Sequence, residues 1–344
     1  MPQQEFGLTA QTPVLDAARR VLSRRFEAVR DRLAEAIHAG GDRPAAIHAL
    51  RVATRRAAAA VDVFDSCLPT RIGRRCRRHL RQLRKAAGGP RDWDVFLAAV
   101  ARSEQDDASI SRTGAGRLLT GYAVAGRIPA DATLAKAFTG EPFAFERTMA
   151  ETVAAIRDTG GPATLAEFAR PLMLRRASLF DAACGVAVDP ASGAGDGWEQ
   201  LHQARIAGKR LRYAIEILRE CLSARSCKPV LKALTRLQEI LGTVNDDSTA
   251  IGHIRRLAGG LEAVGDPRLA EPLATLRAVA DTRERAMAAG RDRFSDWLTG
   301  WRSPCLRQAL QAICLPGGDL AGRPAGCPLP QGECGGGGCS ERAA

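Results

Sequence analysis

The chain has 344 residues, 45% of them hydrophobic, so it is long enough for two domain-sized cores or one large duplicated domain, and wholesale disorder is excluded. Aromatic residues make up only 5%, and the abundance of Ala, Leu and Arg favours helices over strands. The formal net charge is +12, with five lysines among the fifty basic residues. Such a surplus attracts anions, and the arginine fork offers paired hydrogen bonds to phosphate oxygens.

Hydrophobic periodicity and helix-breaking residues predict an all-α chain made of two related helical bundles with a basic cleft between them. Residues 1–12 are expected to form a flexible N-terminus. Helices are expected over residues 13–39, 44–66, 71–87, from about 92, and over 143–158, 163–184, 198–222, 228–241, 246–258, 266–289 and 291–301. Residues 103–142 are interrupted by several glycines and prolines, which predicts short helices and loops there.

Two segments differ in composition from the helical ones. Residues 189–197 are rich in Pro, Gly, Ser and Asp, and we expect them to link a first helical half, residues 13–188, to a second half, residues 198–302. Residues 303–344 are rich in Gly, Pro and Cys with few large apolar residues, which predicts a disordered tail. The cysteines of this tail have irregular spacing and no neighbouring His, which does not fit a zinc site.

Targeting signals are not apparent in the sequence. Residues 1–40 contain no signal-peptide pattern, and no stretch approaches the roughly 18 apolar residues of a membrane span. We therefore expect a soluble, cytoplasmic protein without a membrane partner. The cysteines that precede the tail lie in helical patterns, where free thiols are ordinary, so no disulfide framework is expected.

An internal duplication is the most informative feature of the sequence. Residues 48–56 match residues 202–210 at an offset of 154, with His and basic residues in register. The same offset relates Gly88 to Gly242 and several leucines between these segments. Two homologous helical units are therefore expected to pack as pseudo-symmetric halves.

The basic residues of each copy share one helical face. At about 100° per residue, the His and basic side chains fall on one arc, and apolar side chains fall on the opposite one. The polar arc of the first copy consists of His48, Arg51 and Arg55, and that of the second copy consists of His202, Arg205 and Lys209. Val52 and Ile206 lie near these arcs, which indicates that the basic faces line a partly enclosed cleft.

The helix expected at residues 71–87 adds a second basic row to the first copy. Its members are Arg74, Arg77, Arg78, Arg81, Arg84 and Lys85. Like charges at i,i+4 weaken a helix by a few tenths of a kcal/mol per pair, so this run indicates an anionic partner. The second copy carries only the row Lys228, Lys232 and Arg236. We therefore expect the anion site to be strongest on the first copy.

Other chemistries fit the sequence less well. No nucleotide-binding loop is present, and the basic residues at i+3 and i+7 from each His repel a metal cation. The basic arcs contain no pair of carboxylates for acid–base catalysis. Asp92, Asp94, Asp246 and Asp247 could bind magnesium, but they are expected to cap helices after glycine turns. We therefore predict no enzymatic activity, no cofactor and no resident metal.

Four segments together resemble the CHAD domain, the "conserved histidine α-helical domain", over about residues 13–300. They are HxxRVxxRR at 48–56, GGPRDWD at 88–94, HxxRIxxKRLRY at 202–213 and LGTVND at 241–246. The resemblance implies two helical bundles around a basic channel that binds inorganic polyphosphate, and association with polyphosphate granules. Matched by position, it implies binding by His48, Arg51, Arg55, Arg56, His202, Arg205, Lys209 and Arg210.

The two copies differ just after this motif. Ala57 and Ala58 in the first copy stand where the second copy has Leu211 and Arg212, so Arg212 is a further candidate contact without a counterpart. Nucleic acid is the main alternative ligand, since it is also a phosphate chain, although the basic arcs offer no aromatic side chain for base stacking. An acidic protein partner of the same face stays open, as does the oligomeric state.

Overall fold

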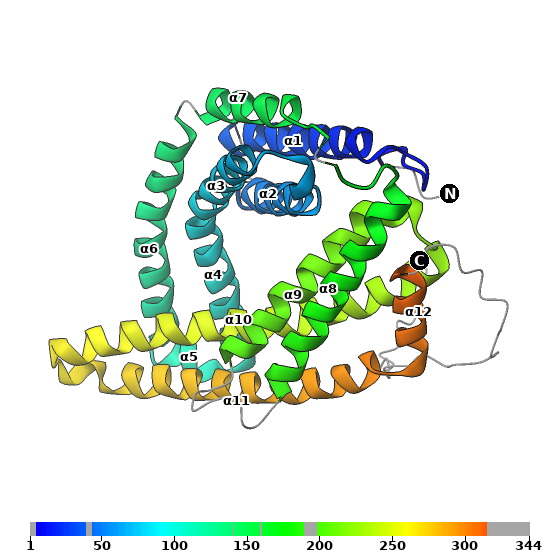
Figure 1. Ribbon diagram of the computed structural model, residues 1–344. Helices are drawn as coiled ribbons and strands as arrows, with labels where there is room; N and C mark the ends of the chain where they lie inside the picture. Colours follow the sequence, from blue (N-terminus) through cyan, green and yellow to red (C-terminus); the bar gives the residue numbers. More distant parts are fainter. Residues whose placement is uncertain (1–4, 39–42, 140, 159, 189–197, 315–344) are drawn as a thin grey trace, which may run out of the picture.

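The computed structural model describes residues 5–38, 43–139, 141–158, 160–188 and 198–314, and this part of the chain is all-α, without strands (Figure 1). An isolated bridge joins Pro13 and Thr164. The α-helices are α1 Val14–His38, α2 Arg43–Val63, α3 Thr70–Ala86, α4 Gly88–Asp106, α5 Ala108–Arg112, α6 Ala115–Phe138, α7 Glu141–Ala154, α8 Leu165–Val188, α9 Trp198–Leu218, α10 Ala224–Val264, α11 Ala270–Trp301 and α12 Pro304–Cys314. Short 3-10 turns η1 Asp65–Cys67, η2 Arg219–Cys221 and η3 Pro267–Leu269 join some of them.

The helices pack as two related sets. α1 packs on α2, α2 on α3, and α4 on α6, while α7 covers α1 and α3. In the same way α8 packs on α9, α9 on α10, and α10 on α11, while α12 covers α8 and α10. Figure 1 shows most of the first set in the upper left, with α8, α9 and α12 of the second set to the right and α10 and α11 running across the bottom. The expected linker, residues 189–197, lies outside the described residues.

Helix α10 is continuous where we expected two helices, and so is α11. In the first set the chain breaks at Ala87, and Pro90 follows in the first turn of α4, where its missing N–H is tolerated. At the matching position the second set has Val244, which keeps its amide and lets α10 run on through Gly242. The proline therefore decides whether the helix breaks here.

The expected capping role of the four aspartates is wrong because none of them lies at the start of a helix. α4 begins at Gly88, so Asp92 and Asp94 lie inside it, and Asp246 and Asp247 lie in the middle of α10. Instead, Asp94 forms an ion pair with Arg127, and Asp247 accepts a hydrogen bond of 2.8 Å from Arg283 Nη1. These aspartates join helices rather than begin them.

Residues 103–142 are also more regular than expected, because they form most of a helical hairpin that includes the 24-residue helix α6. Its glycines permit close packing instead of ending the helix. A Cβ at Gly126 would lie 2.1 Å from Trp93 Cζ2, and a Cβ at Gly89 would lie 3.1 Å from the Cβ of Ala130. Composition alone does not distinguish a glycine that breaks a helix from one that brings two helices together.

This packing predicts a large effect for one small substitution. Gly126→Ala should lower the free energy of unfolding by about 1–3 kcal/mol, because the new methyl group would overlap the Trp93 ring. Gly121→Ala in the same helix is the matched control, since nothing lies within 4 Å of its added Cβ and alanine favours helix. Urea unfolding of both variants measures the difference. Equal stabilities would contradict the close α4–α6 contact.

Two terminal segments are ordered against expectation. Phe6 and Leu8, which we expected in a flexible N-terminus, are buried, and their amides donate to the Glu220 carboxylate at 3.0 and 2.7 Å. Residues 304–314, which we expected in the tail, form α12, with Ile313 and Cys314 buried. α12 covers an apolar face of α8 and α10, which explains why this short segment folds. Residues 315–344 lie outside the described part.

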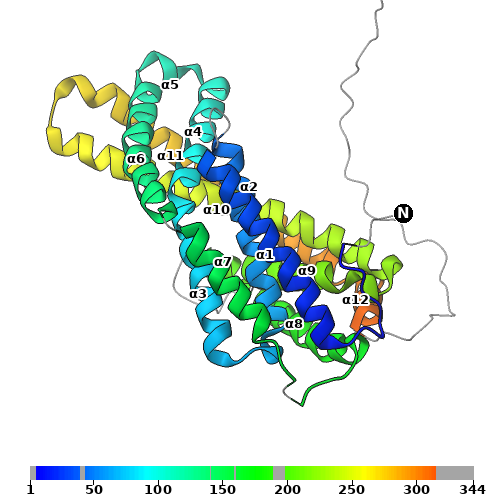
Figure 2. The same cartoon turned by 90° about the horizontal axis from the view of Figure 1, so that it is seen from above.

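The core is divided. The main cluster spans both sets, and a smaller one, which includes Phe96, Leu119, Ile254 and Leu276, joins the α4–α6 hairpin to the outer part of α10 and α11. Figure 2 shows these two hairpins side by side at one end of the molecule.

None of the described helices is long and apolar enough to cross a membrane. Cys67, Cys76, Cys184, Cys221, Cys227 and Cys314 are free thiols.

Candidate functional site

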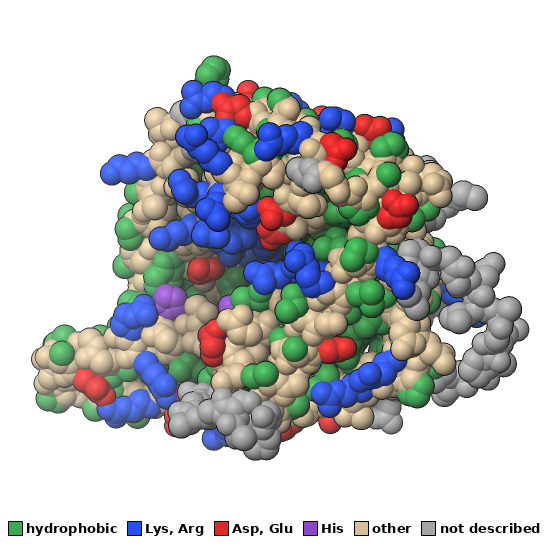
Figure 3. All heavy atoms as spheres, in the orientation of Figure 1, with side chains coloured by type: hydrophobic (Ala, Val, Ile, Leu, Met, Phe, Trp, Pro, Cys, Tyr) green, Lys and Arg blue, Asp and Glu red, His purple; other side chains and the backbone are tan. Residues whose placement is uncertain are grey.

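Helices α2 and α9 pack against each other, so the basic faces of the two copies meet. Five cations from three helices act on one another here: Arg51 and Arg55 of α2, Arg84 of α3, and Arg205 and Lys209 of α9. We call these five residues the central cluster. Figure 3 shows Lys and Arg side chains gathered around a hollow in this face of the molecule, between α3 and α9. The structure thus brings both copies of the basic motif into one site.

Lys209 reports the electrostatics of the central cluster. Burial, followed by the charges of Arg205, Arg55, Arg84 and Arg51, lowers its pKa from 10.5 to about 7. Burial is also the first cause that lowers the pKa of Arg51, Arg84 and Arg205, although guanidinium groups stay charged at neutral pH. Cations are therefore held together out of water, at a free-energy cost that a bound anion would relieve.

Few protein groups neutralise these cations. Arg51 Nη2 lies 3.8 Å from Asp92 Oδ1, and Arg51 Nη1 donates to the Arg84 carbonyl oxygen at 3.3 Å. The Nε atoms of Arg55 and Arg205 are buried and have no hydrogen-bond partner among the described residues. A buried donor without a partner is unfavourable unless a ligand or water accepts from it. The arrangement therefore suits an anion with several acceptor oxygens.

The two motif histidines lie beside the cluster. Burial, followed by the charges of Arg91, Arg55 and Arg51, lowers the pKa of His48, so its ring is neutral at pH 7. A neutral imidazole can donate one hydrogen bond to a phosphate oxygen but adds no charge. His202 is exposed and lines a pocket with Arg205 between α9, α10 and α11.

Other predicted residues lie on the flanks of the central cluster. Arg77 forms an ion pair with Asp65 at 2.6 Å, and the charge of Arg210 lowers the pKa of the half-buried Asp62 carboxyl, which burial raises. The charge of Arg81 lowers the pKa of Arg84, so Arg81 borders the central cluster. Arg56 and Arg212, on the opposite flank, line a different pocket.

The remaining predicted residues are peripheral. Arg74, Arg78 and Lys85 are exposed on α3, and Lys228, Lys232 and Arg236 are exposed on α10. Arg236 also forms an ion pair with Glu239 at 3.2 Å. The exposed α10 row therefore lies outside the central cluster.

Three residues near the site escaped the sequence reasoning. The charge of Arg91 lowers the pKa of both His48 and Arg51. Tyr213 raises the pKa of Arg84 and Arg205. Both residues lie in the segments that resemble the CHAD domain, and this position was the sequence signal that could have identified them. Arg176 of α8 acts on Asp62, and it matches Arg25 of α1, although at an offset of 151 rather than 154. Tyr213, four residues after Lys209, also corrects the expectation that the basic arcs contain no aromatic side chain.

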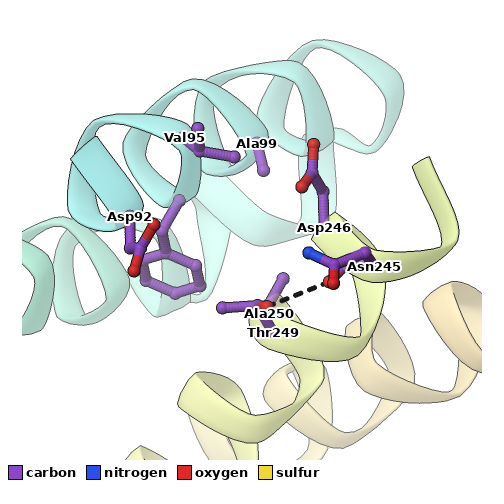
Figure 4. Close-up of a pocket in the computed structure, with 8 residues that line it drawn as sticks. Asp92, Val95, Ala99, Asn245, Asp246, Thr249 and Ala250 are labelled. Carbon is purple, nitrogen blue, oxygen red and sulfur yellow. Dashed lines mark hydrogen bonds between the residues drawn. The ribbon is translucent and has the colours of Figure 1, made fainter. Parts of the chain in front are cut away.

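A small pocket between α4 and α10 lies next to the central cluster. Figure 4 shows Asp92 and Asp246, which are equivalent in the two copies, on opposite sides of it, together with Asn245 and Thr249. Burial raises the pKa of Asp92, Arg51 lowers it, and Asp246 raises it again. Among the described residues, no group of three or more His, Cys, Asp or Glu side chains is arranged to hold a metal ion. The pocket thus presents two carboxylates at the edge of a cationic site.

The geometry agrees with a known family. The model of the CHAD domain family matches residues 20–255, which is more than half of the chain. The chain belongs to the CHAD domain family. The match includes both basic motifs and the helices α2, α3 and α9 that carry the central cluster.

Two solved structures share this CHAD fold. The crystal structure of the CHAD domain from the plant Ricinus communis is 24% identical, with a TM-score of 0.64, and the likeness covers 91% of this chain and 96% of that one. PptA from Streptomyces chartreusis is 20% identical, with a TM-score of 0.63 and coverage of 87% and 100%. A comparison with curated protein sequences gave no match. At these identities the structural likeness bears on the fold alone.

Proposed function

We propose that this CHAD domain binds inorganic polyphosphate, without catalysis, in the central cluster. The observation that carries the proposal is the convergence of four arginines around Lys209, whose pKa falls to about 7. A chain of phosphates would supply acceptor oxygens to the unpartnered Nε atoms of Arg55 and Arg205 and would relieve the repulsion among the cations. Membership of the CHAD family supports the same ligand.

Nucleic acid is the weaker candidate because the site offers little for bases. Tyr213 is an aromatic side chain near the cluster, but one ring cannot stack successive bases along a strand. The nearby rings of Trp93, Phe96 and Tyr122 pack against each other and against His253 in the smaller core. A thin, base-free polyanion fits this surface better than a duplex or a stacked single strand.

The proposal assigns no catalytic role to the acidic pair. Asp92 lies beside Arg51, whose charge favours the carboxylate, and Asp246 lies across the pocket. Both carboxylates line the pocket that borders the central cluster. We propose that they limit the length of phosphate chain held in the cluster by repelling it at this edge.

A competition experiment tests the ligand. Long-chain polyphosphate should displace single-stranded DNA of matched phosphate count at physiological ionic strength, and its own affinity should fall steeply as salt rises, because counterions are released. Incubation with magnesium should release no phosphate from the bound polymer. Equal affinity for DNA would overturn the ligand, and metal-dependent phosphate release that is lost in Asp92→Asn would overturn the non-catalytic role.

If the ligand is polyphosphate, the protein should be found where this polymer accumulates in the cell. A fluorescent fusion of the protein should collect at polyphosphate granules and spread evenly in cells that cannot make the polymer. The Arg55→Gln/Arg205→Gln variant should spread in both kinds of cell, since its cluster has lost two cations. Nucleoid staining that persists without polyphosphate would favour nucleic acid instead.

A further inference from the structure

A second cationic pocket lies on the flank of α2 and α9, where the N-terminal segment crosses the second set of helices. It has a volume of about 270 Å³. Its charged lining consists of Arg25, Arg56, Arg212, Arg219, Glu5 and Glu216. We call this the Arg25 pocket. The charges that act most strongly on Arg25 are Glu5, Arg56 and Glu216, and no member of the central cluster is among them.

Arg25 is unusual for an arginine because its side chain is only 9% exposed. Its guanidinium lies over the Phe6 ring, 4.9 Å from the centroid, and its Nη1 donates to Glu5 Oε1 at 2.8 Å. Its Nε is buried without a partner among the described residues. Burial lowers the pKa of Arg25 and Glu5 raises it, so the Glu5 carboxylate is the main anion that stabilises this buried cation.

The charged residues of the Arg25 pocket can be compared with those at equivalent positions on the flank of the first set. There, Arg176, Arg210 and Asp62 stand in place of Arg25, Arg56 and Glu216. Asp65 and Ala58 stand where the Arg25 pocket has Arg219 and Arg212. At these two positions the Arg25 pocket has arginines in place of an acid and an alanine, and it has Leu231 where the first flank has Arg77 paired with Asp62 and Asp65.

Glu5, which lies outside the two repeated units, partly neutralises the positive charge of the Arg25 pocket. The backbone beside it is fixed, because the amides of Phe6 and Leu8 donate to Glu220 and both side chains are buried. The Glu5 side chain itself is 36% exposed, so it can turn out to solvent while the segment stays in place. A single carboxylate is thus held on a fixed support above four arginines.

We propose that the Arg25 pocket is a second phosphate-binding site, in which the Glu5 carboxylate occupies the position of a phosphate group. When Glu5 turns outward, the pocket presents four arginines against Glu216 alone, and Arg212 keeps that acid engaged through a hydrogen bond of 2.7 Å. A compact phosphate dianion has the charge and the acceptor oxygens to replace Glu5 on Arg25, Arg56 and Arg219. Its source is either free pyrophosphate or the end group of a polyphosphate chain.

Calorimetric titration with pyrophosphate tests the site. Glu5→Gln removes the competing charge and should raise the affinity roughly fivefold, as expected for a partly exposed ion pair. Arg56→Gln/Arg219→Gln should lower it about tenfold or more, and both side chains are exposed, so the fold should persist. The matched control is Arg55→Gln/Arg205→Gln, which changes the central cluster and should leave pyrophosphate binding at this pocket unchanged.

The outcomes separate this site from the central cluster. If Arg55→Gln/Arg205→Gln abolishes pyrophosphate binding while the Glu5 and Arg56/Arg219 variants bind like the unmodified protein, the pocket is not a site. Failure of pyrophosphate to bind any of these proteins, Glu5→Gln included, would also overturn the inference. Failure of the central variant to lose polyphosphate would instead count against the proposed function and leave this inference standing.

Polyphosphate of different lengths distinguishes the two sources of the phosphate group. If the pocket takes chain ends, Arg56→Gln/Arg219→Gln should lower the affinity for short and long chains by the same factor when concentration is counted in chains. If the pocket takes free pyrophosphate only, the same variant should bind both polymers like the unmodified protein. Either result, with the pyrophosphate data above, supports the site.

Discussion

Arg55→Gln/Arg205→Gln is expected to lower the affinity for long-chain polyphosphate by at least about a hundredfold at physiological ionic strength. Hydrogen bonds to charged groups contribute about 1.5–3 kcal/mol each, and each of these arginines has a buried Nε that lacks a protein partner. Glutamine removes the charge and most donors but retains much of the apolar stem. Fluorescence or calorimetric titration over a range of salt concentrations measures the change, and the dependence on salt should become shallower by about two released counterions.

The matched control for this variant is Lys228→Gln/Lys232→Gln, which also removes two charges. These lysines are exposed on α10 and lie outside the central cluster, so their loss should reduce the affinity only a few-fold. The cluster variant should also unfold at the same or a higher temperature, because neutral side chains relieve the repulsion that the folded state imposes. Equal losses of affinity in the two variants would show that binding depends on net charge and not on the central cluster.

The affinity for polyphosphate should fall as the pH rises above 7. In the free protein the pKa of Lys209 is about 7, and a bound polyanion raises it toward the ordinary value of 10.5. Binding therefore takes up a proton between these two values, so the affinity should decrease by up to about tenfold per pH unit in this range. Burial and the neighbouring arginines hold the pKa of His48 below 6.5, so its protonation affects binding only at lower pH.

The stability of the free protein should change with pH in the opposite direction. Since the folded-state pKa of Lys209 lies below the unfolded one, the folded protein binds fewer protons between pH 7 and 10.5, and its free energy of unfolding should rise with pH in this window.

Lys209→Arg is the informative variant for both effects, because arginine keeps the charge and does not titrate in this range. It should bind polyphosphate with nearly constant affinity from pH 6.5 to about 8.5. Lys232→Arg on the exposed surface of α10 is the control and should retain the pH dependence of the unmodified protein. A pH dependence that survives in Lys209→Arg would show that another group titrates on binding.

Local signals explain what could be predicted. The offset of 154 residues and the opposite arcs of basic and apolar side chains identified α2 and α9 and placed Arg51, Arg55, Arg205 and Lys209 on their polar faces. Helical periodicity depends on neighbours within one turn, so it can be read from the chain alone. The all-α fold and membership of the CHAD family are confirmed.

Helix ends were harder to predict, because the same residue type can act in two ways. Gly242 was expected to end a helix, but without a proline after it α10 continues. Gly126 was expected to break the chain, but it lies against Trp93 and allows α4 and α6 to approach. α12 folds only because α8 and α10 leave it an apolar face to cover. Each of these outcomes depends on a partner distant in sequence.

The sequence by itself therefore determined the helical class, the duplication and the positive charge of two helical faces, because each depends on spacing along the chain. Only the tertiary structure decided which charges meet. It brought Arg84 to the α2–α9 contact, left Lys228 and Lys232 outside it, and lowered the pKa of Lys209. It also placed Glu5 on the buried Arg25. The physical reason is that electrostatic energies depend on distance and on exclusion of water, and both are set when helices far apart in sequence pack together.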